Sequence, residues 1–512
     1  MARDFVSCDR GQLLLMPPSL VEWLPEDHLV WTVLGAVEVM DLSRFNEAYR
    51  LGAAGRPAYD PAMMVALLMY AYARGNRSSR GIERACEEDV AFKVITSMRM
   101  PDHSTIAEFR RRHEADIAEL FDGVLGLCRE AGLVSVGVIT IDGTKIKANA
   151  SMDQNRSYRK LVTEILREAE ETDRREDELY GPDRGDELPE QLRTPNGRRA
   201  ALEEAKRRLA ERKGRVISEE EPVAELVVDP ELVLGRAGRR GGRREWPRVA
   251  RRELEARRAD EARPIPRDRE DRLVQALDRF EENHRIDLAA NNAYDRWRAT
   301  ARDTKGRVLK GNSKPFVASE MPEGVINLSD PDSRVMRTQG TPPRQAYNAQ
   351  AAVNEKQVIL AAEISIAAPD FGHLAPMLET TLNELREQGA SEMPEVVLAD
   401  AGYWHTAQMQ AIAEQGIEVL VPPDGNMREG KRPGWDDGLY QQMRDTLTSD
   451  RGRELYAQRK ITIEPVFGQI KYNRRIDRFM RRGRAAAQSE WRLVTATHNL
   501  LKLHSHWVAA TA

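Results

Sequence analysis

Three acidic residues lie in sequence contexts that suit metal-dependent chemistry. Asp142 ends the apolar run that begins at Val136, and Asp400 ends the apolar run that begins at Val396. Glu464 begins the segment Glu-Pro-Val-Phe-Gly-Gln-Ile-Lys, which lies in a helical pattern. Two carboxylates at strand ends and one on a helix can hold two divalent cations at one point. We therefore interpret Asp142, Asp400 and Glu464 as candidate catalytic and metal-binding residues for cutting and joining phosphodiester bonds.

The reaction itself explains why carboxylates are needed. A phosphodiester is already negative and repels a hydroxyl or water nucleophile, so two hard cations offset the charge and activate the nucleophile. Mg²⁺ binds oxygen and keeps part of its water shell, so two or three carboxylates are sufficient. We expect two Mg²⁺ ions per site, with Mn²⁺ able to substitute. Asp142 would bridge both ions, Asp400 would complete one site and Glu464 the other.

Basic and aromatic residues accompany the three acids. Lys471 lies seven residues beyond Glu464, about two helical turns, so the two side chains can share a helix face. A lysine there can pair with a DNA phosphate beside the metal ions. Tyr456 and Arg459 precede the glutamate and can add stacking and phosphate contacts. The candidate DNA-binding residues around the acids are Lys145, Lys147, Tyr456, Arg459 and Lys471.

The net charge limits how nucleic acid could be bound. The 512 residues allow about three domains at ~150 residues each. Charged residues make up 31% of the chain, but the net charge is only −4. DNA binding must therefore come from local basic patches. Arg236 to Arg244 and Arg474 to Arg484 are two such patches, and an ordinary solvated surface is the alternative interpretation of each.

The cysteines and the apolar segments indicate the compartment. Cys8, Cys86 and Cys128 show no paired or metal-type spacing, which favours reduced thiols. The N-terminus lacks the pattern of a signal peptide. The apolar stretch from Met63 to Ala73 is shorter than the roughly 20 residues that span a bilayer. We expect a soluble cytoplasmic protein that makes no membrane contact and is associated with the nucleoid when bound to DNA.

Residues 1–130 are predicted to form a helical DNA-binding domain. The stretch from Pro61 is apolar nearly all round, as in a buried helix. A later helix is predicted around Thr105 and Glu108, which fit a capping box. The arginines that follow would lie on an exposed face, as in a helix-turn-helix DNA reader, although plain helical packing is an alternative. The candidate DNA contacts in this helix are Arg110, Arg111 and Arg112.

The remaining strands and helices predict a catalytic domain that is interrupted. Residues 156–324 are rich in Arg, Glu and Ala, and favour a charged, largely helical insertion. The strand before it and the strands and helices after it follow the order of a ribonuclease H-like α/β fold. We therefore predict that residues 131–155 and 325–505 form a split catalytic domain. The strand that ends at Asp142 would then pair with a hairpin and with the strand that ends at Asp400.

Several other residues compete for a functional role. Asp330 and Asp332 are rival carboxylates, but Asp-Pro-Asp-Ser favours a turn. His405 could contact DNA, but an ordinary packed histidine is the simpler interpretation. Pro465 is expected in the first turn of a helix or at a helix break, because proline lacks the N–H group that a helix interior needs.

At these residues the chain closely resembles the DDE transposases of bacterial insertion sequences. The similarity covers about residues 15–150 and 290–505 and is much weaker across the charged insertion. In some related transposases, three residues separate the arginine from the glutamate of a Tyr-x-x-Arg-x-x-x-Glu-x6-Lys signature, whereas four separate Arg459 from Glu464 here. The motifs that carry the resemblance begin at Tyr59 (YDPAMM), Arg77 (RSSRGIE), Pro101 (PDHSTIAEFR), Ile141 (IDGTK), Asn327 (NLSDPDSR), Tyr347 (YNAQAAV), Ala399 (ADAGY) and Glu464 (EPVFGQIK).

The resemblance implies a specific activity. It implies Mg²⁺-dependent cleavage at the terminal inverted repeats of the element, followed by strand transfer into target DNA, with Asp142, Asp400 and Glu464 as the catalytic triad. Double-stranded DNA would be the partner, and a homo-oligomer would bring two DNA ends together. Two alternatives remain at this point: a DNA-binding regulator that does not cut, and a nuclease on the same fold that hydrolyses without joining.

Overall fold

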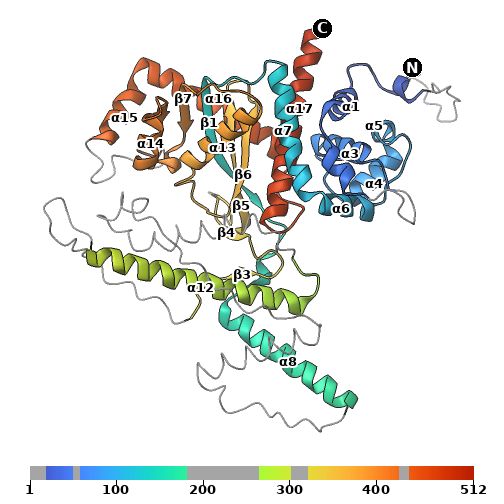
Figure 1. Cartoon of the computed structure of the whole chain (residues 1–512), viewed down its shortest axis with the longest axis vertical. Helices are drawn as coiled ribbons and strands as arrows, with labels where there is room; N and C mark the ends of the chain where they lie inside the picture. Colours follow the sequence, from blue (N-terminus) through green and yellow to red (C-terminus); the bar gives the residue numbers. More distant parts are fainter. Residues whose placement is uncertain are drawn as a thin grey trace, which may run out of the picture.

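The computed structural model places three groups of elements beside one another. They are an N-terminal group of helices, a mixed β-sheet flanked by helices, and two long helices that lie below the sheet in the view of Figure 1. The described residues are 19–49, 58–180, 265–300, 321–338, 340–425 and 438–511.

The sheet has six strands in the order β4-β5-β1-β7-β8, and β6 pairs with β5 beside β4. β1 is antiparallel to β5 and parallel to β7, so the central strand joins the hairpin β5–β6 to the parallel strands. This is the pairing that the sequence predicted for its first catalytic strand, and the mixed α/β sheet is confirmed. The strands are β1 (Val138–Lys147), β4 (Arg334–Met336), β5 (Arg344–Asn354), β6 (Ile359–Ser365), β7 (Val396–Ala399) and β8 (Glu418–Leu420).

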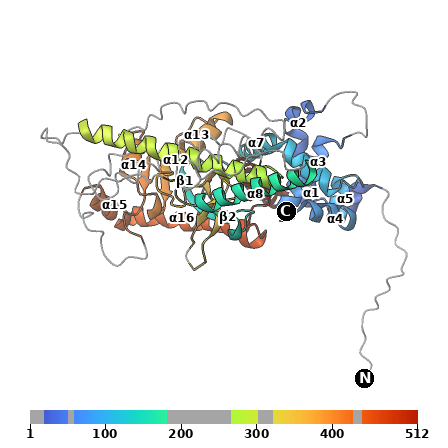
Figure 2. The same ribbon diagram turned by 90° about the horizontal axis from the view of Figure 1, so that it is seen from below.

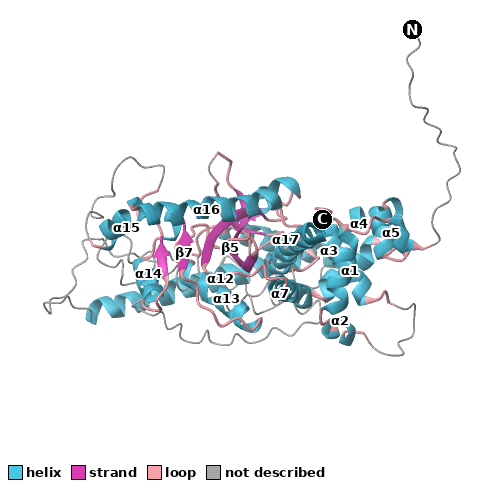
Figure 3. Cartoon of the chain, turned by 90° about the horizontal axis from the view of Figure 1, so that it is seen from above, coloured by secondary structure: helices cyan, strands magenta, loops and turns pink. Residues whose placement is uncertain are grey.

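Helices cover both faces of the sheet. α13 and α16 lie on opposite faces, as the views of Figures 2 and 3 show. α16 packs against β1, β5 and β7, and α13 against β1, β5 and β6. The helices of this part are α13 (Leu374–Glu387), α14 (Thr406–Ala413), α15 (Leu439–Thr448), α16 (Asp450–Gly468), the π-helix η5 (Gln469–Asn473) and α17 (Arg484–Thr511).

The N-terminal helices pack around α3. Asp60 caps α3 by accepting a hydrogen bond from Ala62 N at 2.8 Å, and Pro61 occupies the first turn, where no N–H is needed. Residues 64–73 of this helix are all buried, which confirms the prediction of a buried helix. The helices are α1 (Leu29–Val39), α2 (Ser43–Glu47), α3 (Pro61–Ala73), α4 (Ser79–Glu88), α5 (Val90–Ile95), α6 (His103–Arg112) and α7 (Glu114–Glu130), preceded by the 3₁₀-helix η1 (Leu20–Trp23).

α7 and α17 connect the N-terminal helices to the sheet. They lie side by side between the two parts, and α17 also packs against α3 and β6 (Figure 1). The buried apolar residues of the N-terminal helices and of the sheet form one continuous cluster. The sheet therefore packs against the N-terminal helices through a shared apolar core.

The segment between β1 and β4 supplies a second, small core. α8 (Tyr158–Tyr180) packs against α12 (Arg269–Thr300), and β2 (Asn155–Arg156) pairs with β3 (Ile326–Asn327). The described part of the predicted insertion is thus largely helical. Its arginine patch, residues 236–244, lies outside the described residues, as do residues 181–264 and 301–320. Among the described helices, none is both long enough and apolar enough to cross a membrane.

Candidate active site

The candidate site lies where β7 ends and β1 continues. Ile141 of β1 pairs with Ala399 of β7, so Asp142 and Asp400 are the next residues on two adjacent parallel strands and project from the same face. Asp400 directly follows its strand, as predicted. The prediction that Asp142 ends a strand is wrong, because β5 continues to pair with β1 as far as Lys147.

α16 is anchored to β1 beside these aspartates. The hydroxyl groups of Thr140 and Thr462 lie 3.0 Å apart, and both residues are buried. One turn earlier on the helix, Nη2 of Arg459 donates to Oδ2 of Asp142 at 2.7 Å and lies 3.9 Å from Oδ2 of Asp400. One guanidinium group therefore faces both aspartates. Arg459 was predicted to contact DNA, but in this structure it is paired with the acids.

Glu464 lies on α16, as predicted, but it is not gathered with the two aspartates. Its side chain is exposed, and its charge raises the pKa of Arg459 less than the charges of Asp142 and Asp400 do. Among the described residues, the carboxylate oxygens of Asp142, Asp400 and Glu464 do not all lie within 4.8 Å of one another. The structure thus assembles the two aspartates around Arg459 and places Glu464 further along the same helix.

The proline beside Glu464 is accommodated inside the helix. α16 continues through Pro465 and becomes a π-helix at Gln469, so the prediction of a first-turn position or a break is wrong. Proline lacks the N–H that would bond to the carbonyl oxygen of Ile461. Gln357, from the β5–β6 turn, supplies the missing donor, because its Nε2 donates to that oxygen at 2.9 Å.

Burial dominates the electrostatics of Asp142. It raises the pKa of this carboxyl group to about 7, Arg459 lowers the pKa, and Asp400 and Asp370 raise it. The Asp142 side chain is only 14% exposed, whereas that of Asp400 is 40% exposed. Two adjacent carboxylates of this kind need a nearby positive charge to remain ionised together.

A polar layer lies on the opposite face of β1. Oδ1 of Asp370 accepts from Lys145 Nζ at 3.0 Å, from Asn348 Nδ2 at 2.8 Å and from Gln350 Nε2 at 2.9 Å. Gly143 makes room for this layer, since a Cβ atom there would lie 2.2 Å from Gln350 Nε2. Sequence reasoning missed Asp370, which follows no strand or helix signal.

The lysines predicted to contact DNA differ in availability. Lys145 pairs with Asp370 at 3.0 Å in this structure, and its assignment as a DNA contact stays a prediction. Lys147 pairs with Asp477 at 2.5 Å and is partly exposed. Lys471 lies in the π-helix and donates to the carbonyl oxygen of Lys145 at 3.1 Å and to the hydroxyl of Thr144.

Two further features affect the residues around α16. Because Lys471 lies in a π-helix, the α-helical spacing from which a shared face with Glu464 was predicted does not apply. Burial lowers the pKa of Lys471, and the neighbouring cations Lys145 and Arg344 lower it further. Tyr456 is partly buried, and burial raises its pKa.

The arginines of α6 are not equivalent. Arg110 is buried and donates to Tyr72 Oη at 3.2 Å and to the carbonyl oxygen of Arg77 at 2.9 Å, so its predicted exposure to DNA is wrong. Arg111 and Arg112 are exposed, with 66% and 44% of their side-chain surfaces accessible. Both lie close to Glu108.

The cap of this helix also differs from the prediction. α6 begins at His103, and its N-cap is Asp102, which accepts from Thr105 N at 2.7 Å. Thr105 is therefore inside the helix, and Glu108 pairs with Arg111 instead of closing a capping box. The helix begins three residues earlier than the capping-box interpretation requires, because the Asp102 side chain accepts from a free N–H group of the first turn.

The rival carboxylates have structural partners. Asp330 is fully buried and accepts from Tyr347 Oη at 2.6 Å. Asp332 pairs with Arg279 of α12 and accepts from Arg484 N at 3.0 Å, so it links α12 to the start of α17. The turn interpretation of this segment is confirmed by the hydrogen bond from Ser333 N to Asp330 O at 3.2 Å.

His405 also has a structural role. Its Nδ1 accepts from Gln408 N at 3.3 Å, which caps α14, and its ring stacks on Phe371. This confirms the interpretation of His405 as a packed histidine.

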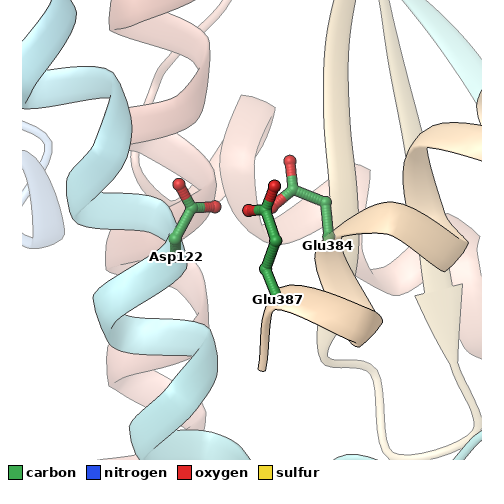
Figure 4. Close-up of side chains that lie close together, drawn as sticks. All are labelled: Asp122, Glu384 and Glu387. Carbon is green, nitrogen blue, oxygen red and sulfur yellow. The ribbon is translucent and has the colours of Figure 1, made fainter. Parts of the chain in front are cut away.

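A second acidic cluster joins α7 to α13. Asp122, Glu384 and Glu387 bring carboxylate oxygens within 4.8 Å of one another, and Figure 4 shows their side chains converging. Arg492 of α17 lies against this cluster, since it pairs with Glu384 and lies 3.5 Å from Asp122. Burial and the neighbouring Glu384 raise the pKa of Asp122. We interpret the cluster as a structural ion-pair network between helices.

Comparison with known families gives two matches. The family described as Transposase domain (DUF772) matches residues 18–112, and the family described as Transposase DDE domain matches residues 325–500. The second match contains Asp400 and Glu464, whereas Asp142 lies outside both ranges. No curated protein and no solved structure matches the chain significantly.

The two matches agree with the architecture. A DDE domain implies a ribonuclease H-like fold, which accords with the mixed sheet, and transposase domains imply DNA binding. The N-terminal match ends at the last residue of α6, and the C-terminal match ends within α17. The chain is a DNA transposase and belongs to the DDE transposases of insertion sequences.

Proposed function

We propose that this transposase binds the terminal inverted repeats of its own insertion sequence and catalyses Mg²⁺-dependent strand cleavage and strand transfer. The observation that carries the proposal is the register between β1 and β7, which makes Asp142 and Asp400 adjacent although 257 residues separate them in the chain. Glu464 is the third proposed catalytic residue, because it lies on the helix that packs against both strands.

The donor atoms fit a hard divalent cation. Asp142, Asp400 and Glu464 offer only carboxylate oxygens, which Mg²⁺ prefers and Mn²⁺ accepts. These three residues would hold the metal ions. When bound, such ions offset the negative charge of the phosphate and lower the pKa of an attacking hydroxyl or water. The raised pKa of Asp142 supports this assignment, since the pair is built to receive a positive charge.

The residues of the chain itself would position the DNA. Arg111 and Arg112 are exposed cations on α6 and are proposed to contact phosphates of the bound repeat. Near the acids, Lys147, Tyr456 and Lys471 are proposed contacts for the strand that is cut. Arg459 is proposed to hold the two aspartates together in the free protein. When DNA binds, its guanidinium group is proposed to leave the aspartates and to pair with a phosphate.

We further propose that the protein acts as a homo-oligomer on DNA, because joining requires two transposon ends to be held at once. Light scattering of the protein with end DNA should show at least two copies per complex. A strictly monomeric complex would contradict this part of the proposal.

The decisive experiment combines purified protein, Mg²⁺ and labelled DNA that carries the sequences flanking its own gene. Asp142→Asn and Asp400→Asn should abolish cleavage and joining while DNA binding remains. Glu454→Gln is the matched control, since Glu454 is an exposed acid on the same helix as Glu464 and should leave the reaction unchanged.

Three other outcomes would contradict the proposal. Cleavage that survives in the aspartate variants would exclude these residues as the catalytic centre. Specific binding without cleavage by the wild type would favour a DNA-binding regulator. Cleaved products without joined products would favour a nuclease on the same fold.

A further inference from the structure

β1 extends past the end of β7, and the segment after the π-helix covers its free edge. Lys147 N donates to the carbonyl oxygen of Asp477 at 3.0 Å, and Phe479 N donates to the carbonyl oxygen of Lys147 at 2.8 Å. Lys147 and Arg478 thereby form a short parallel bridge. This arginine-rich segment is therefore fixed to the same strand that carries Asp142.

The segment has a buried side and an exposed side. Ile476 and Phe479 are fully buried, and Arg474 is buried and donates to Thr497 Oγ1 at 2.8 Å. Arg475 and Arg478 lie between these anchors and are exposed. The sequence predicted one basic patch from Arg474 to Arg484, with a solvated surface as the alternative, but the structure divides it into buried and exposed arginines.

The two exposed arginines have an acidic neighbour, Asp477. Burial raises the pKa of its carboxyl group, but Lys147 and Arg478 lower it, and the pKa lies below its ordinary value. Within the described parts of the chain, neither Arg475 nor Arg478 forms a side-chain ion pair with an acidic residue. Asp477 is the acidic residue between them, and it pairs with Lys147. The surface is therefore positive and complementary to a phosphate backbone.

Tyr472 lies beside these arginines and is unusually open to solvent. Its side chain belongs to the π-helix and is 82% exposed, the largest exposed fraction among the large hydrophobic residues that are described as exposed. A single exposed aromatic residue needs no explanation by itself. Here, however, the ring follows Lys471 directly and precedes the two exposed arginines, a combination of aromatic ring and cations that suits single-stranded nucleic acid.

The surface formed by Tyr472, Arg475 and Arg478 lies close enough to the candidate active site for one DNA strand to contact both. Lys147 lies five positions beyond Asp142 on β1, which is about 17 Å at roughly 3.3 Å per residue. Duplex DNA advances ~3.4 Å per nucleotide of each strand and an unpaired strand can extend further, so this length corresponds to at most about five nucleotides. A strand whose phosphate lies at the acids can therefore reach this surface by following β1.

We propose that Tyr472, Arg475 and Arg478 form a binding surface for an unpaired DNA strand next to the cleavage point. The Tyr472 ring stacks on an unpaired base, and the two guanidinium groups pair with phosphates of the same strand. The proposal rests on the proposed function, because it assigns part of the substrate strand to a surface beside the same active site.

The test measures DNA binding by the full chain without added metal, so it is independent of cleavage. The first probe is a blunt duplex of the sequence that flanks the gene. The second is the same duplex with a five-nucleotide single-stranded tail that contains 2-aminopurine, whose fluorescence decreases when the base stacks. Wild-type protein should bind the tailed DNA roughly five- to 150-fold more tightly, the range for stacking of one base on an aromatic ring.

Tyr472→Ala should lose both the tail preference and the fluorescence decrease, and Tyr472→Phe should keep both. Since the side chain is exposed, neither variant should change the melting temperature. Equal tail preference and equal quenching in wild type and Tyr472→Ala would overturn the assignment of Tyr472.

The arginines are tested through the salt dependence of binding. The double variant Arg475→Ala/Arg478→Ala should lower the magnitude of the slope of log K against log salt by about 1.4, at ~0.7 for each phosphate contact with a single strand. Arg451→Ala/Arg453→Ala is the matched control, because it removes two exposed arginines of α16 that are paired with acids. An equal loss in both double variants would overturn the proposed surface.

Failure of this inference can be told apart from failure of the proposed function. Asp142→Asn should bind both probes as the wild type does, because the assay contains no metal. If Tyr472→Ala binds like wild type while the wild type cuts and joins DNA, only the strand surface is wrong. If the wild type binds the tail but never cuts, the proposed function is wrong and the surface remains.

Discussion

Nη2 of Arg459 lies 2.7 Å from Oδ2 of Asp142, and this ion pair defines the candidate active site. The same nitrogen lies 3.9 Å from Asp400, so one cation faces both the buried Asp142 carboxylate and the more exposed carboxylate of Asp400. A divalent cation at these carboxylates must compete with the guanidinium. The arginine therefore sets the metal affinity of the site as well as its local geometry.

We predict that Arg459→Ala increases the affinity of the site for Mn²⁺ by about tenfold or more. The substitution removes a positive charge that competes with the metal ion for the two carboxylates, and the Coulomb energy between two unit charges at 4 Å is about 4 kcal/mol at an effective dielectric constant near 20. Calorimetric titration with Mn²⁺ measures this affinity directly. Arg451→Ala is the control, since Arg451 lies on the same helix and pairs with Glu418 instead. Unchanged or weaker Mn²⁺ binding in Arg459→Ala would show that the ion pair does not oppose the metal.

A second prediction concerns the contact that accommodates Pro465. Gln357→Ala should lower the free energy of unfolding by about 0.5–1.5 kcal/mol, because it leaves the Ile461 carbonyl oxygen without its donor. Pro465→Ala restores a backbone N–H at the position that bonds to this oxygen in a regular helix. The cost of Gln357→Ala should therefore be smaller in the Pro465→Ala background.

A double-mutant cycle measured by denaturant unfolding isolates this coupling. Gln357 also accepts a hydrogen bond from Lys502 at 2.6 Å, but loss of that contact is common to both backgrounds and cancels in the cycle. A coupling energy of zero would mean that Gln357 does not compensate for the proline. The cleavage rate should follow the same pattern, because Glu464 directly precedes Pro465.

Local sequence was sufficient to predict the central features of the fold. The apolar, β-branched runs before Asp142 and Asp400 are typical of buried strands, and the parallel pairing of those strands follows from the order of elements. The helix that carries Glu464 was also predicted. What could not be predicted is the length of β1, because its pairing with β5 depends on residues more than 190 positions later in the chain.

The errors at single residues have the same origin in tertiary contacts. Arg110 lies in an arginine run that resembles an exposed face, yet Tyr72 and Ser79 bind it in the interior. Asp370 lies in a loop without any helix or strand pattern, and only the fold brings it behind Gly143. A local sequence pattern cannot show these contacts, because in both cases the contacting residues are distant in the chain.

A third prediction tests the polar layer behind β1. Gly143→Ala should lower the free energy of unfolding by about 1–3 kcal/mol, because the new Cβ atom would lie 2.2 Å from Gln350 Nε2 and 2.6 Å from Asp370 Oδ1. Gly137→Ala is the matched control, since its Cβ atom would meet only the end of the Glu355 side chain at 4.0 Å. Denaturant unfolding compares the two, and equal stability would contradict the close packing of this layer.

The last prediction separates a structural carboxylate from a catalytic one. Burial raises the pKa of Asp330 to about 6, from an ordinary value of 3.8. The folded protein therefore binds a proton at this group more tightly than the unfolded chain does. The stability that this proton contributes is fully present below pH 3.8 and is lost as the pH rises through about 6.

Asp330→Asn cannot ionise at this position, so it should lack that pH dependence. Relative to wild type, its free energy of unfolding should increase by up to about 3 kcal/mol between pH 4 and pH 7. Thermal or denaturant unfolding across this range measures the difference, and other buried groups such as His498 cancel because both proteins contain them. Cleavage by Asp330→Asn at neutral pH should persist, because Tyr347 and Ser333, not a substrate, surround this carboxylate. Loss of cleavage with an unchanged pH profile would instead place Asp330 in the catalytic centre.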